Sequence, residues 1–206
     1  MIKNISWIFF DVGSTLVDET MAYEDRMKKI AEMANVSYEY VYKIEIEFYK
    51  QNKKGDLETV KMLNVEKPIW RHEYETLYSD TKKCLEVLSG KYKIGVIANQ
   101  SLGTENRLKN FGILKYIDLV IASAEEGAAK PDRKIFEIAL NRANCISEQA
   151  VMIGDRIDND IVPAKEIGMK TILIRQGFFR YWRITSDSEK ADYEVNNLSE
   201  IINIIR

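Results

Sequence analysis

From about residue 80 onward the chain alternates apolar strand-like runs with helix-like runs, and this alternation constrains the fold more than any other feature. The runs at residues 92–98, 117–123, 150–155 and 170–175 are apolar at consecutive positions, and single helical patterns separate them. Strands that are apolar on both faces and joined by single helices form parallel sheets with helices on each side. We therefore predict an α/β fold with a doubly wound parallel sheet.

A further apolar strand near the N-terminus is separated from this region by a long helical insertion. The spacing of apolar residues over the insertion is helical, with Ser37 as a suitable N-cap and Pro68 at a position that suits a helix start. No segment of the insertion is a convincing strand. The predicted division of the chain is an α/β core domain of residues 1–17 and 80–206 and a small all-helical cap domain of residues 18–79.

Composition narrows the range of partners. The 206-residue chain has a formal net charge of −2, so it lacks the basic footprint of proteins that bind nucleic acid or anionic membranes. Its apolar runs, such as residues 7–10, are far shorter than the ~20 residues that span a bilayer. Cys84 and Cys145 are far apart and suggest neither a disulfide framework nor a metal site. We expect a cytoplasmic protein with neither nucleic acid nor membrane as partner; the oligomeric state stays open.

Polar residues that can take part in catalysis or bind a ligand follow the predicted strands. Asp11 comes directly after the first strand, Asn99 after the next, Lys130 one loop beyond a third, and Asp155 with Asp160 after a fourth. The carboxyl ends of parallel strands meet at one edge of the sheet, where open α/β sheets bind their ligands. We predict that these residues converge on one crevice, with Asp11 as the candidate nucleophile.

These residues lie in four motifs that occur in a familiar order. The motifs are FFDVGSTLVD at 9–18, IGVIANQ at 94–100, AAKPDRKIF at 128–136 and IGDRIDND at 153–160. Together they resemble the haloacid dehalogenase superfamily of aspartate-nucleophile phosphohydrolases, and the resemblance covers nearly the whole chain. The helical insertion is similar to the cap of the superfamily's phosphoglycolate phosphatase and dehalogenase-like branch. The resemblance implies a Rossmann-like core and hydrolysis of a small phosphorylated metabolite.

The resemblance also implies roles for individual residues. Asp11 would attack phosphorus and form an aspartyl phosphate, which splits one difficult displacement into two easier steps. Lys130 would offset the charge of Asp11 and of the phosphoryl oxygens. Asp155, Asp11 and the main-chain carbonyl of Gly13 would bind Mg²⁺, which prefers such oxygen ligands. Asp160 would act in the second shell and hold metal waters or Lys130.

Two positions depart from the family pattern. Gly13 stands where hydrolytic members have an aspartate that protonates the leaving group and activates water, a role worth on the order of 10² to 10⁴ in rate. The space at Gly13 can admit water or a substrate group. Ala98 stands where a Ser or Thr hydroxyl normally contacts the phosphoryl group. We expect Ser14 and Asn99 to contact the substrate, and Asn99 or Ser101 to be the available replacements for that hydroxyl.

Three functions remain open at this stage. The first is a Mg²⁺-dependent phosphatase with restricted or weak activity, acting on a substrate whose leaving group needs little protonation, such as an acyl or aryl phosphate. The second is a noncatalytic protein that binds a phosphorylated ligand or a partner. The third is cleavage of a carbon–halogen or carbon–phosphorus bond, because relatives that catalyse these reactions also lack the second aspartate.

The cap sets substrate choice in such proteins, because it closes over the crevice. We favour solvent exposure over substrate contact for its basic side chains, which are Lys53, Lys54, Lys67 and Arg71. The aromatic and basic residues 178–183 can flank the crevice, pack against the cap or form an oligomer contact, and the sequence does not distinguish these roles. The identity of the substrate is likewise open.

Overall fold

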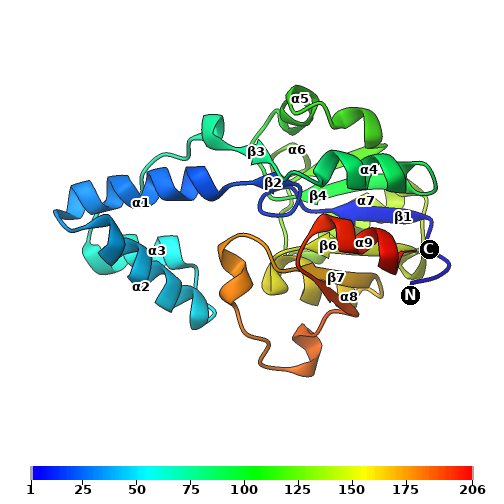
Figure 1. Ribbon diagram of the computed structural model, residues 1–206. Helices are drawn as coiled ribbons and strands as arrows, with labels where there is room; N and C mark the ends of the chain where they lie inside the picture. The colour runs from blue at the N-terminus through cyan, green and yellow to red at the C-terminus, as the bar shows by residue number, and fades with distance from the viewer. Residues whose placement is uncertain (1, 206) are drawn as a thin grey trace.

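A parallel sheet of six strands forms the centre of the computed structural model, which describes residues 2–205 (Figure 1). In spatial order the strands are β5 (Leu119–Ala122), β4 (Lys93–Ala98), β1 (Trp7–Phe10), β6 (Ala150–Gly154), β7 (Lys170–Ile174) and β8 (Tyr193–Val195). Every neighbouring pair in this order is parallel. The predicted α/β class is confirmed, and β1, which precedes Asp11, lies in the interior of the sheet.

Helices cover both faces of the sheet, because successive side chains of a strand point to opposite sides. Phe10 belongs to the apolar cluster on one face and Phe9 to the cluster on the other, and both are fully buried. The first cluster is covered by α4 (Thr81–Ser89), α5 (Thr104–Asn110) and α9 (Leu198–Ile204), and the second by α7 (Arg133–Ala143) and α8 (Val162–Glu166). A short helix, α6 (Ser123–Glu126), follows β5. Among the described helices, none is long and apolar enough to cross a membrane.

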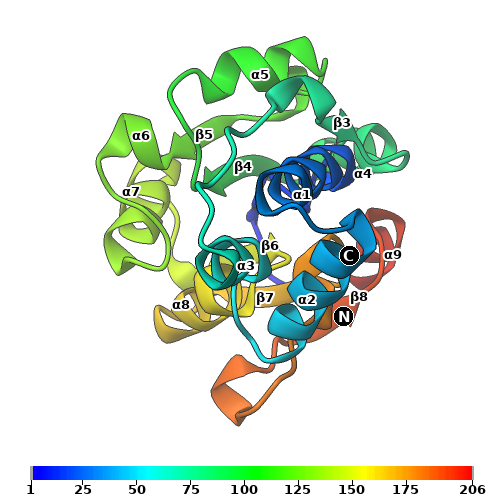
Figure 2. The ribbon, with the colours of Figure 1, turned by 90° about the vertical axis from the view of Figure 1, so that its left-hand side faces the viewer.

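The insertion forms a helical lobe beside the sheet, as the two ribbon views show (Figures 1 and 2). Its helices are α1 (Thr20–Ala34), α2 (Tyr38–Lys50) and α3 (Gly55–Leu63). Ser37 caps α2 as predicted, since its Oγ accepts a hydrogen bond from the backbone N–H of Tyr40 at 3.2 Å. The apolar cluster of the lobe extends to Phe178, Phe179 and Trp182. The aromatic segment after β7 therefore packs against the cap.

The predicted helix after Pro68 is wrong. Only a 3₁₀ turn forms there, at His72–Tyr74, and the strand β3 (Thr76–Leu77) follows it. β3 pairs antiparallel with β2 (Val17–Asp18), so the chain enters and leaves the lobe through one two-stranded ribbon. The Glu75 carboxylate accepts a hydrogen bond from the Trp70 indole at 2.7 Å, which links the two ends of this segment. Long-range pairing with β2 thus overrides the local helical pattern.

Candidate active site

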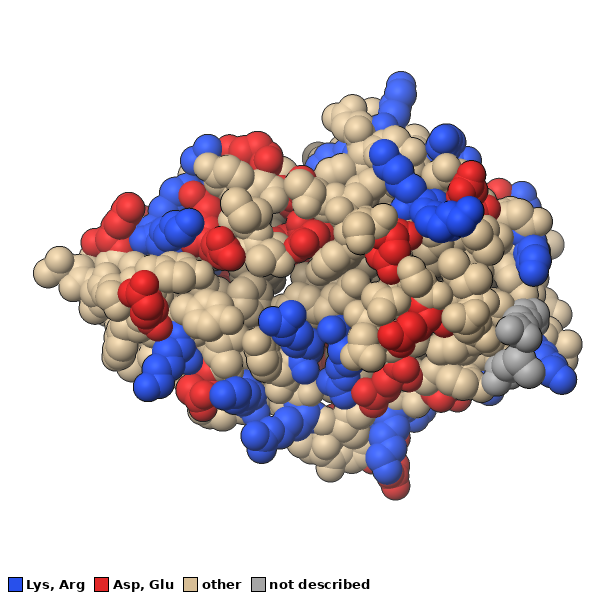
Figure 3. Space-filling view, viewed as in Figure 1, with Lys and Arg blue, Asp and Glu red and all other residues tan. Residues whose placement is uncertain are grey.

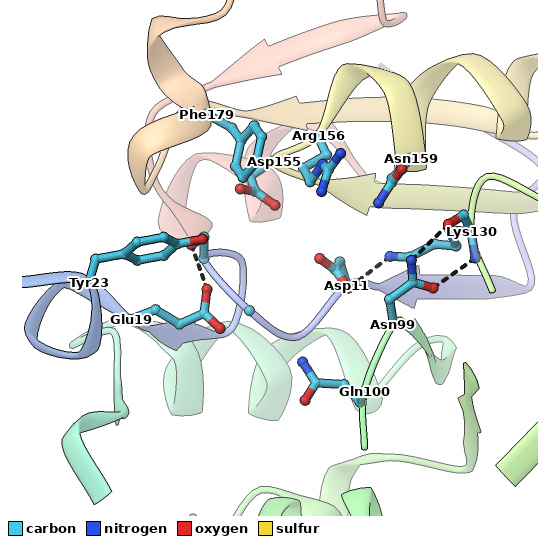
Figure 4. Close-up of a pocket in the computed structure, with 12 residues that line it drawn as sticks. Asp11, Glu19, Tyr23, Asn99, Gln100, Lys130, Asp155, Arg156, Asn159 and Phe179 are labelled. Carbon is cyan, nitrogen blue, oxygen red and sulfur yellow. Dashed lines mark hydrogen bonds and ion pairs between the residues drawn. The ribbon is translucent and has the colours of Figure 1, made fainter. Parts of the chain in front are cut away.

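The loops at the carboxyl ends of β1, β4 and β6 bring the predicted residues together (Figure 4). Asp11, Asn99 and Asp155 each follow the last residue of one of these strands. Lys130 reaches the same place from the loop between α6 and α7, and Asp160 from the π-helical turn Ile157–Ile161. Residues distant in sequence thus meet at one edge of the sheet, where its parallel strands end.

Lys130 is the centre of a buried ion network. Its Nζ lies 2.8 Å from Oδ1 of Asp11 and 2.6 Å from Oδ1 of Asp160, and the lysine side chain is 1% exposed. Burial lowers the pKa of Lys130, but the attraction of the two carboxylates outweighs it, so the pKa is raised overall. The lysine therefore supplies a fixed positive charge beside Asp11.

Asp155 lies close to the two carboxylates that pair with this lysine. Oxygen atoms of Asp11, Asp155 and Asp160 all lie within 4.8 Å of one another. Burial, followed by the repulsion of the other two carboxylates, raises the pKa of Asp155 well above its ordinary value. Burial also raises the pKa of Asp160 to about 6, although Lys130 acts in the opposite direction. One lysine does not balance three carboxylates, and a divalent cation would relieve their repulsion.

The Asn99 side chain holds the segment that carries Lys130. Its Nδ2 donates to the backbone carbonyl of Lys130 and its Oδ1 accepts from the backbone N–H of Lys130, both at 2.7 Å. These two bonds occupy the amide in this structure, and a contact of Asn99 with substrate stays a prediction. The neighbouring Ala98 is fully buried at the end of β4 and offers no polar side-chain atom.

The loop after Asp11 brings Glu19 beside Gly13. Ser14 adopts a left-handed conformation, with φ of 53°, and its Oγ donates to Oε2 of Glu19 at 2.9 Å. The carboxyl group of Glu19 fills the space beside Gly13 that the sequence left for water or substrate. Burial is the largest influence on this group and raises the pKa of Glu19 to about 8, although the Ser14 hydroxyl lowers it. The predicted contact of Ser14 with substrate stays a prediction.

The sequence profile of the family described as haloacid dehalogenase-like hydrolase matches residues 8–174. The chain belongs to this family. It is 36% identical over 126 residues to a glyceraldehyde 3-phosphate phosphatase of Methanocaldococcus jannaschii, covering 61% of this chain and 54% of the relative. It is 27% identical to a glyceraldehyde 3-phosphate phosphatase of Pyrococcus furiosus, over 99% of this chain and 94% of the relative. The chain spans about half the length of the first curated relatives it matches, 50% to 54%.

Solved structures agree with this family assignment at the level of the fold. The haloacid dehalogenase-like protein YfnB of Bacillus subtilis, crystallised bound to magnesium, superposes with a TM-score of 0.73. The match covers 98% of this chain and 99% of the Bacillus protein at 18% sequence identity. The Rossmann-like core with a helical cap, implied by the motifs, is therefore confirmed.

In this haloacid dehalogenase-like hydrolase a cavity of about 170 Å³ is lined by Asp11, Asn99, Lys130 and Asp155, with Asp160 buried behind them. Tyr23 of α1 and Phe179 from the segment after β7 form part of its wall. A second hollow of about 290 Å³ adjoins it, shares both of these residues, and is also lined by Lys54 and Lys67. Figure 3 shows the surface hollowed where the helical lobe meets the core, with Lys and Arg side chains gathered below the hollow. Lys54 and Lys67 are exposed to solvent, as expected, and they also lie beside the site.

Sequence reasoning missed several residues in and behind the cavity wall. Thr15 lies behind the wall, fully buried, with its Oγ1 3.5 Å from Oδ1 of Asp155. Arg156 lines the cavity and stacks over the Phe179 ring at 4.4 Å from its centroid. Glu19 was also missed, although a second acidic residue just after the first motif was a usable signal once Gly13 had been noticed. No sequence pattern indicated that Tyr23 would line the cavity, because its position depends on the direction in which α1 leaves the core.

Proposed function

We propose that this haloacid dehalogenase-like hydrolase is a Mg²⁺-dependent phosphatase that acts on a small phosphorylated metabolite through an aspartyl phosphate on Asp11. One observation carries the proposal: Oδ1 of Asp11 is held 2.8 Å from the buried Nζ of Lys130, in a cavity also lined by Asp155. The names of the curated relatives support a phosphate monoester as substrate, and a triose phosphate is the first one to test.

Each residue of the network has a distinct role in the proposed reaction. Asp11 attacks phosphorus, and Lys130 offsets the negative charge of the nucleophile and of the phosphoryl oxygens. Asp160 positions Lys130 through the 2.6 Å contact between its Oδ1 and Nζ. Ser14 and Asn99 remain the proposed substrate contacts, the latter also anchoring the backbone of Lys130.

The donor set fits Mg²⁺. The carboxylate oxygens of Asp11, Asp155 and Asp160 lie within 4.8 Å of one another, and oxygen ligands of this kind are those that Mg²⁺ prefers. We assign Asp11, Asp155 and the main-chain carbonyl of Gly13 as its ligands, with Asp160 in the second shell. When bound, the ion would offset the charges of the carboxylates and of the substrate phosphate.

The proposed domain division follows from these roles. Residues 1–17 and 80–206 form the catalytic core and residues 18–79 the cap that covers the cavity. A cavity of about 170 Å³ suits a small molecule rather than a macromolecule. We further propose a reducing cytoplasmic location, in keeping with Cys84 and Cys145, which are both unpaired.

One observation favours a noncatalytic phospholigand-binding protein as the second candidate. Ala98 has no hydroxyl, and both polar atoms of the Asn99 amide are bonded to the backbone of Lys130. Loss of one oriented donor to a phosphoryl oxygen costs on the order of 10² in rate. Turnover therefore decides between the two candidates.

The test uses purified protein, Mg²⁺ and a panel of acetyl phosphate, p-nitrophenyl phosphate and glyceraldehyde 3-phosphate. We expect phosphate release that Asp11→Asn abolishes, and that the control Asp187→Asn, at an exposed carboxylate, leaves unchanged. Equal turnover by Asp11→Asn and the unmodified protein would refute the phosphatase. Binding of inorganic phosphate without turnover of any ester would support the second candidate instead.

A further inference from the structure

The carboxyl group of Glu19 occupies the space that a side chain at position 13 would need. A Cβ atom added to Gly13 would lie 2.5 Å from Oε1 of Glu19 and 2.8 Å from Oε2. Separations this short are far inside van der Waals contact, so a larger residue at position 13 would displace the Glu19 carboxylate. The missing side chain at position 13 and the carboxylate of Glu19 are therefore alternative occupants of one place.

The position of the Glu19 side chain is not explained by the helix that it precedes. Glu19 is the N-cap residue of α1, yet its side chain makes no capping hydrogen bond. It turns instead toward the cavity that Asp11 and Lys130 line, where Ser14 Oγ donates to Oε2 at 2.9 Å (Figure 4). Ser14 thus holds one oxygen of the Glu19 carboxyl group, and Glu19 lines the cavity.

We propose that Glu19 is the general acid and base of this protein, supplying from the start of α1 the carboxyl group that Gly13 lacks. The inference rests on the proposed phosphatase function. It assigns a catalytic role to a residue outside the four motifs that identified the site. It also gives a reason for glycine at position 13: without a side chain there, the loop leaves room for the carboxylate of Glu19, six residues further along the chain.

The proposed reaction has two steps. Asp11 Oδ attacks phosphorus, the bond from phosphorus to the leaving oxygen breaks, and the Glu19 proton moves to that oxygen, so the alcohol departs. The Glu19 carboxylate then removes a proton from water, and the water oxygen attacks phosphorus. The bond from phosphorus to Asp11 breaks, inorganic phosphate leaves, and Glu19 is protonated again. General acid–base catalysis of this kind contributes roughly 10² to 10⁴ in rate.

The test compares phosphate esters that differ in how much their leaving group needs a proton. We expect Glu19→Gln to slow turnover of glyceraldehyde 3-phosphate, an alkyl ester, by ~10² or more. Formation of the phosphoenzyme from p-nitrophenyl phosphate should slow by less than ~10-fold, because its leaving group departs without protonation. Glu19→Gln also removes the base of the second step, which is hydrolysis of the phosphoenzyme. The phosphoenzyme should therefore accumulate, and acid quenching of the reaction should reveal it. The control is Glu32→Gln, an exposed carboxylate on the same helix.

A second pair of variants protects the test against a folding defect. Gly13→Asp alone should be less active than the unmodified protein, because two carboxylates then compete for one place. Gly13→Asp combined with Glu19→Ala frees that place and should recover alkyl-ester turnover relative to Glu19→Ala alone. Recovery would support the shared position of the two carboxyl groups.

The outcomes separate this inference from the proposed function. Loss of activity in Glu19→Gln by the same factor for alkyl and aryl esters, without phosphoenzyme accumulation, would overturn the role of Glu19 and leave the phosphatase intact. Unchanged turnover in Glu19→Gln, with Asp11→Asn inactive, would have the same meaning. No turnover of any phosphate by the unmodified protein would overturn the proposed function, and the role of Glu19 with it.

Discussion

Lys130 Nζ lies 2.8 Å from Asp11 Oδ1, although the two residues are 119 positions apart in the chain. The lysine side chain is 1% exposed and the aspartate side chain is 13% exposed. Lys130 is therefore shielded from water, whereas Asp11 is open toward the cavity. A buried ion pair adds little net stability, but removing one partner leaves an uncompensated charge and is costly. We therefore expect the pair to orient Asp11, the proposed nucleophile, rather than to strengthen the fold.

Replacement of Lys130 by methionine tests this role. Lys130→Met leaves Asp11 and Asp160 without their buried counter-charge, so we expect a loss of about 3–5 kcal/mol in the free energy of unfolding. We also expect phosphatase activity to fall by ~10² or more. Urea denaturation and initial rates measure the two effects. The matched variant Lys134→Met, at an exposed position of α7, should change neither, and near-normal activity in Lys130→Met would contradict the assignment.

Metal removal and Asp155 form a second test. Without Mg²⁺ the carboxylates of Asp11, Asp155 and Asp160 repel one another, so Asp155→Asn should have a higher Tm than the unmodified protein in EDTA. Addition of Mg²⁺ should raise the Tm of the unmodified protein, because the ion binds only the folded state, and should barely change that of the variant. Differential scanning fluorimetry measures both. Equal Mg²⁺ shifts in the two proteins would refute Asp155 as a ligand.

Glu45 in the cap predicts a pH dependence of stability. Its side chain is fully buried in α2, and neither carboxyl oxygen has a hydrogen-bond partner among the described residues. Burial, with repulsion by Asp56, raises the pKa of Glu45 from 4.5 to about 8. Between these two pH values the folded state binds more protons at Glu45 than the unfolded state does, so its contribution to stability falls as pH rises from about 4.5 to 8.

The variant Glu45→Gln isolates this contribution. We expect its free energy of unfolding to exceed that of the unmodified protein at pH 8 and to vary less between pH 5 and pH 8, in urea titrations at fixed salt. Glu39→Gln, at an exposed carboxylate of the same helix, should leave the pH dependence as it is. A steeper fall with pH in Glu45→Gln would show that the sign is wrong.

The hollow beside the cavity predicts a difference between two adjacent lysines. Lys54 lines this hollow, whereas Lys53 lies near the Phe48 ring, 5.8 Å from its centroid. Lys54→Ala should raise KM for a phosphorylated substrate by about threefold with little change in kcat, because one solvent-exposed charge contributes no more than ~1 kcal/mol to binding. Lys53→Ala should leave KM unchanged. Equal effects of the two substitutions would mean that substrate does not approach the hollow.

The convergence of Asp11, Lys130 and Asp155 could be expected from the chain alone, because parallel strands place their carboxyl ends at one edge. The sequence alone could not show that the predicted helix after Pro68 was wrong. Its residues carry a helical pattern, and only pairing of Thr76–Leu77 with Val17–Asp18, almost sixty residues earlier, selects a strand. The aromatic segment that begins at Phe178 had three open roles, and the structure shows two of them: Phe178 packs against Tyr49 of the cap, and Phe179 lines the cavity.

The sequence by itself determined the sheet, the order of its elements and the residues at the strand ends, because apolar periodicity and motif spacing are properties of the chain. Only the tertiary structure decided that the carboxyl group of Glu19 fills the space beside Gly13. That placement depends on the direction in which α1 leaves the core and on the hydrogen bond from Ser14. The physical reason is that occupancy of a volume is settled by packing between elements, which no local pattern encodes.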